Sequence, residues 1–301
     1  MLGFTLDAQA FCLQRTCDSL LDDDGCQFDR ELGCPTEGGE LYYSSNCLSF
    51  SVSKGTGEFL DMSDEEFEDI VAEAFFKWEN ADCGDGMRPN LRVQRAGVIE
   101  ANDSFFCGTQ PELNTSLWFL NDDWSTQDPR SLGFTTSTFA VGESAENFGE
   151  IFDADVELNV GKIRDDFPFD TRRVVLLSIA THEAGHFLGL GHSNDREAVM
   201  AAAYSQRDLL TRQLTKDDEA AVCAAYGAVR VDERLECSAP GVSEAAFDEF
   251  ACEQAGQTFE EAGCTAANVG RPSRGLWAST GLGILLLLMS VRRRSQRVLA
   301  A

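Results

Sequence analysis

The chain contains three histidines, and all of them lie within one stretch of eleven residues, from His182 to His192. His182 and His186 are four residues apart, so on a helix they share one face and both imidazoles can reach one ion. Gly189 can adopt the left-handed conformation that ends a helix and turns the chain back towards His192. The segment therefore predicts a helix, a tight turn and a metal site with three histidine ligands.

Three neutral nitrogens suit zinc and leave one tetrahedral position for water, whose pKa zinc lowers to about 7. Glu183 directly follows the first ligand, where it can take the proton of that water and later pass it to a leaving amine. Two other interpretations are surface histidines without a metal and a structural zinc. A structural site usually has a fourth cysteine or histidine ligand, and the chain has no fourth histidine. We therefore expect one catalytic zinc with Glu183 as general base.

The stretch has the pattern HExxHxxGxxH, and Met200 follows its last histidine by eight residues. This combination resembles the metzincin zinc peptidases. Ser193 after the third histidine, and Tyr204 four residues after Met200, narrow the resemblance to the matrixins, the relatives of the matrix metalloproteases. The resemblance implies that Met200 forms the hydrophobic floor of the zinc site and that Tyr204 lines the substrate pocket.

Residues 214–219, followed by 226–227, are similar to the last catalytic-domain helix of the family, with its aspartate pair at Asp217 and Asp218. The resemblance covers roughly residues 41–228. It implies an α+β metzincin fold with a twisted mixed sheet, a long first helix, a zinc helix and a C-terminal helix. The chain departs from the family in lacking a proline after the methionine, a PRCG-type cysteine switch before the domain, and the histidines of a second, structural zinc.

Residues 149–159 resemble the edge strand that precedes the zinc helix in bacterial matrixins and pairs with the extended substrate. Acidic and apolar side chains alternate along this segment, which is typical of a half-buried strand. One face carries Asp153, Asp155 and Glu157, and the other carries Ala154, Val156 and Leu158. The three acids form either a solvated face or ligands of a calcium ion.

Residues 63–66 form a capping box, and apolar residues recur behind it at helical spacing as far as Trp78. This pattern predicts the long first helix, with its apolar stripe in the core. The zinc helix is expected to begin near Asp170. Strands are expected at 91–98, 117–120, 134–141 and 151–160, in a mixed sheet covered by the helices.

The 301 residues are enough for one catalytic domain of about 150 to 200 residues with small appendages. Acidic residues outnumber basic ones by 51 to 24, which gives a formal net charge of −27. Such a surface repels nucleic acid and makes a polyanionic partner improbable. We expect a monomer that acts on a protein or peptide substrate.

Eleven cysteines, spaced unlike those of zinc ribbons, predict disulfides in an oxidising compartment. Five precede residue 50 and four follow residue 220, so both flanks of the catalytic core would be cross-linked. Because the count is odd, at least one thiol is left over. We expect this to be Cys264, which would be available for anchoring or sorting. The alternative is Cys34, whose thiol could block the zinc as a latency device.

Residues 1–10 end in a small-x-small pattern like that before a signal-peptidase site, although no basic region or long apolar stretch precedes it. We interpret them as the remnant of a signal peptide, the alternative being that the pattern is coincidental. A cysteine-rich segment would follow at 11–40, then the catalytic domain at 41–228. A cysteine-bearing stalk is expected at 229–274.

An apolar run fills residues 275–291, and three arginines follow it directly. This end of the chain, 275–301, predicts a short transmembrane helix with a cytoplasmic C-terminus, and it resembles bacterial C-terminal sorting tails. A buried soluble helix is the alternative.

These features predict an exported bacterial zinc endopeptidase, extracellular or anchored at the cell surface, that hydrolyses extracellular proteins. One alternative is a surface binding or adhesion protein with a vestigial metzincin core, against which the intact Glu183 argues. Another is a metzincin of a different branch, such as an astacin-like protease, against which Ser193 argues.

Overall fold

A computed structural model describes residues 10–17, 27–29, 34–100, 116–124, 130–140, 146–205, 208–210 and 213–237, together with two strands at 255–260 and 265–266. The predicted tail at 275–301, residues 1–9 and Cys264 lie outside the described residues. Among the helices of the described part, none is both long and apolar enough to cross a bilayer.

The long first helix, α1 (Asp64–Glu79), begins at the predicted capping box. Ser63 Oγ accepts a hydrogen bond from Glu66 N at 3.1 Å, and the Glu66 carboxylate accepts one from Ser63 N at 2.8 Å. Together they satisfy two of the N–H groups that a helix start leaves without partners. The predicted apolar stripe is buried: Phe67, Ile70, Val71, Ala74, Phe75 and Trp78.

A mixed sheet of six strands forms the second layer, in the order β3-β1-β4-β6-β5-β9. Strands β3, β1, β4 and β6 pair in parallel, whereas β5 and β9 continue the sheet antiparallel. The four expected strands are present within a few residues of their predicted bounds, and the mixed sheet is confirmed. The strands are β1 (Cys47–Ser53), β3 (Arg92–Ile99), β4 (Leu117–Asn121), β5 (Gly133–Ala140), β6 (Ile151–Asn159) and β9 (Ala255–Glu260).

The prediction that residues 149–159 form the edge strand is wrong. Strand β6 lies between β4 and β5 and uses its hydrogen bonds on both sides. Its alternating pattern arises because the two faces of an interior strand still meet different layers. The outer neighbour of β6 is β5, and on its far side β5 pairs with β9.

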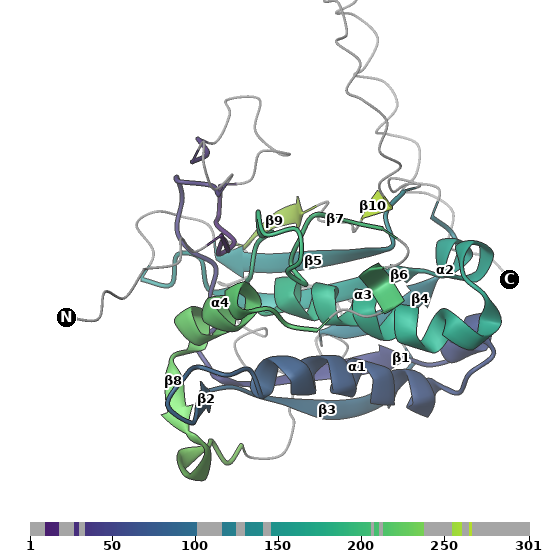
Figure 1. Ribbon diagram of the computed structural model, residues 1–301, viewed down its shortest axis with the longest axis horizontal. Coiled ribbons are helices and arrows are strands. Elements are labelled where there is room, and N and C mark those ends of the chain that lie inside the picture. Colours follow the sequence, from purple (N-terminus) through teal and green to yellow (C-terminus); the bar gives the residue numbers. More distant parts are fainter. Residues whose placement is uncertain are drawn as a thin grey trace, which may run out of the picture. The chain divides into compact units, whose positions relative to one another are not determined.

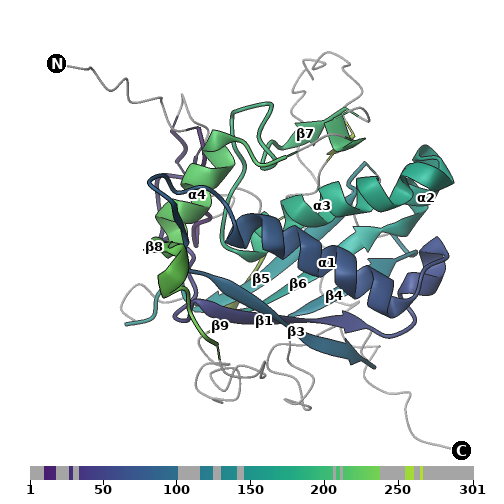
Figure 2. The ribbon, with the colours of Figure 1, turned by 60° about the horizontal axis from the view of Figure 1, so that its bottom comes forward.

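Helices α1 and α3 (Arg172–Phe187) lie side by side on one face of the sheet (Figures 1 and 2). A short turn of 3-10 helix, Phe169–Thr171, leads into α3, so the zinc helix begins close to the predicted residue. The remaining elements are η1 (Gly57–Leu60), β2 (Met87–Pro89), α2 (Val160–Asp166), β7 (Ala203–Tyr204), η4 (Asp208–Leu210), α4 (Lys216–Tyr226), β8 (Ala228–Arg230), η5 (Val231–Glu233) and β10 (Thr265–Ala266).

Four aromatic side chains join the helices to the sheet in the centre of the core: Phe50 on β1, Phe75 on α1, Trp118 on β4 and Phe187 on α3. The ring centroids of Phe75 and Phe187 are 4.9 Å apart, in an edge-to-face arrangement. Burying each such side chain stabilises the fold by about 1.5–3 kcal/mol. The cluster thereby fixes the end of the zinc helix against the sheet.

Disulfides join Cys12 to Cys34, Cys47 to Cys237 and Cys83 to Cys223. The alternative of a free Cys34 that blocks the zinc is therefore wrong, because its sulfur is bonded to Cys12 and is not available as a ligand. Two of the bridges close long loops, with sequence separations of 190 and 140 residues. Loops of this length make a cross-link most effective, because the unfolded chain loses more freedom.

Candidate metal centre

Helix α3 positions the first two histidines and the glutamate between them. His182, Glu183 and His186 have no exposed surface. The indole N–H of Trp78 on α1 donates a hydrogen bond to the carbonyl of Thr181 at 2.8 Å, one residue before the first histidine. Side chains held by such packing keep their orientation, which a metal site requires.

The turn after the helix brings in the third histidine. Gly189 has a φ of +83°, which confirms the predicted left-handed residue. A Cβ there would also lie 3.1 Å from the carbonyl oxygen of Leu41. The carbonyl of Gly189 accepts a hydrogen bond from Gln14 N at 2.9 Å, so the N-terminal segment supports the turn. The chain then reaches His192.

The three imidazoles converge on one point. Their ligand nitrogens lie within 4.8 Å of one another, and Nε2 of His182 is 3.0 Å from Nε2 of His186. Zn–N bonds of about 2.0–2.1 Å place two tetrahedral ligands about 3.3 Å apart, close to this separation. In the described part of the chain, this is the one group of three or more histidine, cysteine or acidic residues that meets the geometry of a metal site.

Two backbone carbonyls determine which nitrogens are available. Nδ1 of His182 is 2.6 Å from the carbonyl of Val199, and Nδ1 of His186 is 2.8 Å from that of Leu190. A carbonyl can only accept, so each Nδ1 carries the proton and each Nε2 keeps its lone pair. Nε2 of His192 is buried and has no hydrogen-bond partner among the described residues.

Burial lowers the pKa of His192 to about 4, so the ring is neutral at pH 7. An ion bound by three neutral nitrogens would give this buried atom the partner that it lacks. The residues therefore fit zinc.

Glu183 lies against strand β5. Its Oε2 accepts a hydrogen bond from Thr135 Oγ1 at 2.7 Å. A Cβ on Gly133 would lie 2.5 Å from Oε1, so only glycine leaves room for the carboxylate. No sequence motif predicted either contact, because both residues belong to β5, far upstream of Glu183 in the chain.

The methionine turn lies beneath the histidines and is held by α4. Met200 is 1% exposed, and its Sδ lies so close to α3 that a Cβ on Gly185 would meet it at 2.2 Å. The Asp218 carboxylate accepts hydrogen bonds from Val199 N at 2.8 Å and Met200 N at 3.0 Å. Burial raises the pKa of Asp218. Since the Val199 carbonyl contacts His182, Asp218 supports the first ligand through one residue.

The other aspartate of the pair holds the segment after the third histidine. Asp217 accepts a hydrogen bond from Ser193 Oγ at 2.6 Å. Its other oxygen accepts from the backbone N–H groups of Ala10 and Phe11, at 2.8 and 3.1 Å. The resemblance predicted the pair, and the structure adds what each carboxylate contacts.

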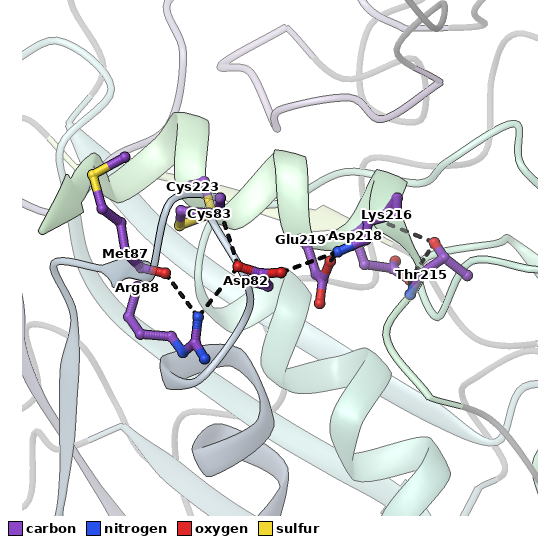
Figure 3. A network of polar contacts seen from close by, with 10 residues as sticks. Asp82, Cys83, Met87, Arg88, Thr215, Lys216, Asp218, Glu219 and Cys223 are labelled. Atoms are coloured by element: carbon purple, nitrogen blue, oxygen red, sulfur yellow. Dashed lines mark hydrogen bonds and ion pairs between the residues drawn. A yellow bond between two sulfur atoms is a disulfide. The ribbon is translucent and has the colours of Figure 1, made fainter. Parts of the chain in front are cut away.

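Helix α4 is attached to the loop after α1 by a disulfide and by an ion pair from Lys216 to Asp82, and Lys216 also pairs with Glu219 of its own helix (Figure 3). The bridge is Cys83–Cys223. Lys216 Nζ lies 3.4 Å from the Asp82 carboxylate and 2.7 Å from that of Glu219. The Lys216–Asp82 pair is exposed, so solvent screens its attraction. The disulfide is therefore the stronger attachment of the helix that carries Asp218.

Tyr204, predicted to line the substrate pocket, is 2% exposed on β7. Its hydroxyl contacts the carbonyl of Val199 and Nδ1 of His182. The structure thus places the phenol oxygen beside a predicted zinc ligand. A role in the pocket wall stays a prediction.

The predicted calcium ligands contact β4 and the residue before it. Asp153 accepts from Ser116 Oγ at 3.2 Å, Asp155 from Leu117 N at 2.9 Å, and Glu157 from Asn121 Nδ2 at 2.9 Å. The three acids therefore have protein donors, and Asp153 is buried. Calcium binding stays a prediction.

Residues 112–227 match the matrixin family. The chain is 28% identical to matrix metalloproteinase-20 of Homo sapiens over 193 residues, which are 64% of this chain and 34% of that protein. It is 25% identical to matrix metalloproteinase-C of Caenorhabditis elegans over 220 residues, 66% of this chain and 31% of that protein. A match to metalloendoproteinase 1-MMP of Arabidopsis thaliana reaches 50% over 54 residues, 18% of this chain and 15% of that protein.

The chain thus spans about a third of the length of the first two relatives. These similarities support a matrixin-type metalloprotease, and the layered mixed sheet with its helices fits a matrixin catalytic domain. The family implies zinc, and the cluster of three histidines is consistent with it.

Proposed function

We propose that this protein is a zinc-dependent endopeptidase in which His182, His186 and His192 hold the metal and Glu183 is the general base. The observation that carries the proposal is the convergence of three imidazole nitrogens. Backbone carbonyls orient two of the rings, and Nε2 of the third has no hydrogen-bond partner among the described residues. When bound, zinc supplies a Lewis acid that polarises the scissile carbonyl and acidifies water.

Glu183 performs the proton transfers. The carboxylate directly follows the first ligand and is held by the hydroxyl of Thr135. It accepts a proton from the attacking water and passes it to the departing amine. A carboxylate fixed in this way needs no reorientation during the reaction, which lowers the barrier. A binding protein with a vestigial metzincin core would not require the Glu183 carboxylate.

The substrate lies extended along the side of β5 that pairs with β9, in place of the β6 edge expected from the sequence. A peptide that pairs with a strand edge gains main-chain hydrogen bonds whatever its side chains. Strand β5 is suited to this role because its Thr135 contacts Glu183, so the paired peptide passes close to the base.

We extend the proposal to an exported enzyme that acts on extracellular proteins. Three disulfides among the described residues support this setting, because such bridges persist in oxidising compartments. A bacterial origin, anchoring by residues 275–301 and the monomeric state stay predictions.

The test uses the full chain with Glu183→Ala, and Glu197→Ala as a matched control because Glu197 is an exposed acid in the same region. Zinc content is measured by elemental analysis, and hydrolysis with a quenched fluorescent peptide at saturating concentration. We expect both variants to keep one zinc, and only Glu183→Ala to lose hydrolysis, by about a thousandfold or more. Undiminished hydrolysis by Glu183→Ala would refute the assignment.

A further inference from the structure

Two strands from the C-terminal part of the chain pair with β5 and β7, which belong to separate sheets. Strand β9 runs antiparallel to β5, with Ala255 opposite Ala140 and Glu260 opposite Thr135. Strand β10 runs parallel to β7, with Ala266 opposite Tyr204. In Figure 1 these strands are the two yellow arrows, one beside β5 and the other beside β7.

Both partner strands contact the predicted catalytic residues. On β5, Thr135 donates to the Glu183 carboxylate. On β7, the Tyr204 hydroxyl touches Nδ1 of His182. Strand β9 therefore pairs with the strand that contacts the predicted base, and β10 pairs with the strand that contacts the first predicted ligand.

The two pairings belong to one short stretch of chain. Only four residues, 261–264, separate β9 from β10, so the chain from Glu260 to Thr265 spans at most about 18 Å. The whole stretch, 255–266, contains no proline, so every residue has a main-chain N–H to donate. Strand β9 pairs in the six-stranded sheet, whereas β10 pairs with β7 in a separate two-stranded sheet. Pairing of a short extended segment with a strand edge is a common mode of peptide recognition.

We infer that β9, together with β10, acts as an internal peptide ligand that occupies the substrate-binding edges of β5 and β7. The inference rests on the proposed function, since it assigns the same edges to the substrate. A strand edge offers one set of N–H and C=O groups, so β9 and a substrate peptide cannot pair with β5 at once. The segment therefore keeps the enzyme latent by competition.

The expected rise in the apparent KM follows from the covalent attachment of the segment to the enzyme. A tethered peptide has an effective concentration of about 1 mM, so an affinity of about 0.1 mM for the edge would raise the apparent KM about tenfold. Competition leaves kcat unchanged. Release of the segment, for example by cleavage between Cys237 and β9, would restore the full affinity for substrate.

The experiment uses the full chain with Thr258→Pro and Phe259→Pro together. One of two adjacent residues in an edge strand directs its N–H to the neighbour, so the pair removes a ladder hydrogen bond in either register. The control places Ser243→Pro and Glu244→Pro in the chain between Cys237 and β9, outside the pairing. Hydrogen exchange is followed at Gly133–Ala140, and at Arg172–Phe187 to verify that the core is folded.

We expect the Thr258→Pro, Phe259→Pro variant to exchange faster at β5, to keep slow exchange at α3, and to show a KM about tenfold lower at unchanged kcat. The control should match the original chain in its exchange at β5, its exchange at α3 and its kinetic constants. Unchanged exchange at β5 would overturn the inference, as would faster exchange with the same KM. If exchange rises at β5 while no form of the protein hydrolyses peptide, the segment does bind that edge and the proposed function is what fails.

Discussion

At the scale of single residues, the predicted catalytic group depends on neighbours from other elements. Glu183 is buried, and its carboxylate is bounded by Thr135 and Gly133 on β5. Buried carboxylates need donors, because an unsatisfied one is costly. The hydroxyl of Thr135 provides a donor and leaves the other oxygen for a proton.

Replacing Thr135 by valine should lower kcat about tenfold and leave the zinc content unchanged, because a hydrogen bond to a charged group is worth about 1.5–3 kcal/mol. Thr136→Val is the control, since this neighbour points to the opposite face of the strand. Both are measured by peptide hydrolysis at saturating substrate and by elemental analysis. Equal kcat values for the two variants would show that Thr135 does not position Glu183.

Gly185→Ala should destabilise the protein by about 1–3 kcal/mol. Alanine improves helix propensity by about 1 kcal/mol, but the new methyl would lie 2.2 Å from Met200 Sδ and 3.0 Å from the Trp78 ring. Met200 is buried and has little room to move, so the overlap outweighs the propensity. Urea unfolding of the metal-free protein measures the change. Increased stability would mean that the methionine turn moves to make room for the new methyl group at little energetic cost.

At the scale of elements, α4 acts as the support of the metal centre. Its first turn carries Asp218, whose oxygens bind the backbone beneath His182. The Cys83–Cys223 bridge joins the same helix to the loop after α1. Helix α3 thus carries His182, and α4 supports it through the backbone of Val199.

Asp218→Asn should weaken zinc binding about 10- to 100-fold, as loss of an indirect support of a ligand typically does. The amide can accept at only one of the two positions where the carboxylate accepts from Val199 and Met200. Asp217→Asn is the control, because Asp217 binds Ser193 and the N-terminal segment. Competition with a zinc chelator gives the affinities. Equal losses in both variants would argue against a specific link through Val199.

At the scale of the whole molecule, zinc and folding are coupled. The sheet, α3 and the turn at Gly189 must all be in place before the three histidines converge, so the metal binds the folded chain. The metal-free protein therefore keeps a buried Nε2 on His192 that has no hydrogen-bond partner among the described residues.

Without zinc, the protein should lose stability as the pH falls from about 6.5 to about 4. Burial lowers the pKa of His192 to about 4 from an ordinary value of 6.5. Between these values the unfolded chain binds a proton that the folded chain does not, so acid favours unfolding. The loss attributable to this group is at most about 3 kcal/mol.

Urea unfolding at pH 7 and pH 4.5, in the presence of a chelator, measures this loss. The variant His192→Gln should lack the part of this loss of stability that is due to His192, because glutamine does not titrate. An identical pH dependence in the variant would assign the loss to other groups.

The sequence by itself determined the chemistry of the site. Spacing alone placed His182 and His186 on one helix face, and Gly189 predicted the turn that brings in His192, because helix geometry and the left-handed preference of glycine are local. The capping box at residues 63–66 likewise predicted the start of α1, and apolar patterns predicted four strands near their observed bounds.

Only the tertiary structure decided which strand is at the edge, what holds each catalytic group, and which cysteines pair. Alternation along 151–159 predicts a strand but carries no information about its neighbours, so β6 was mistaken for the edge strand. The contacts of Thr135 with Glu183, of Asp218 with Val199 and of β9 with β5 join residues far apart in the chain. Such contacts depend on packing of whole elements, which local pattern does not encode.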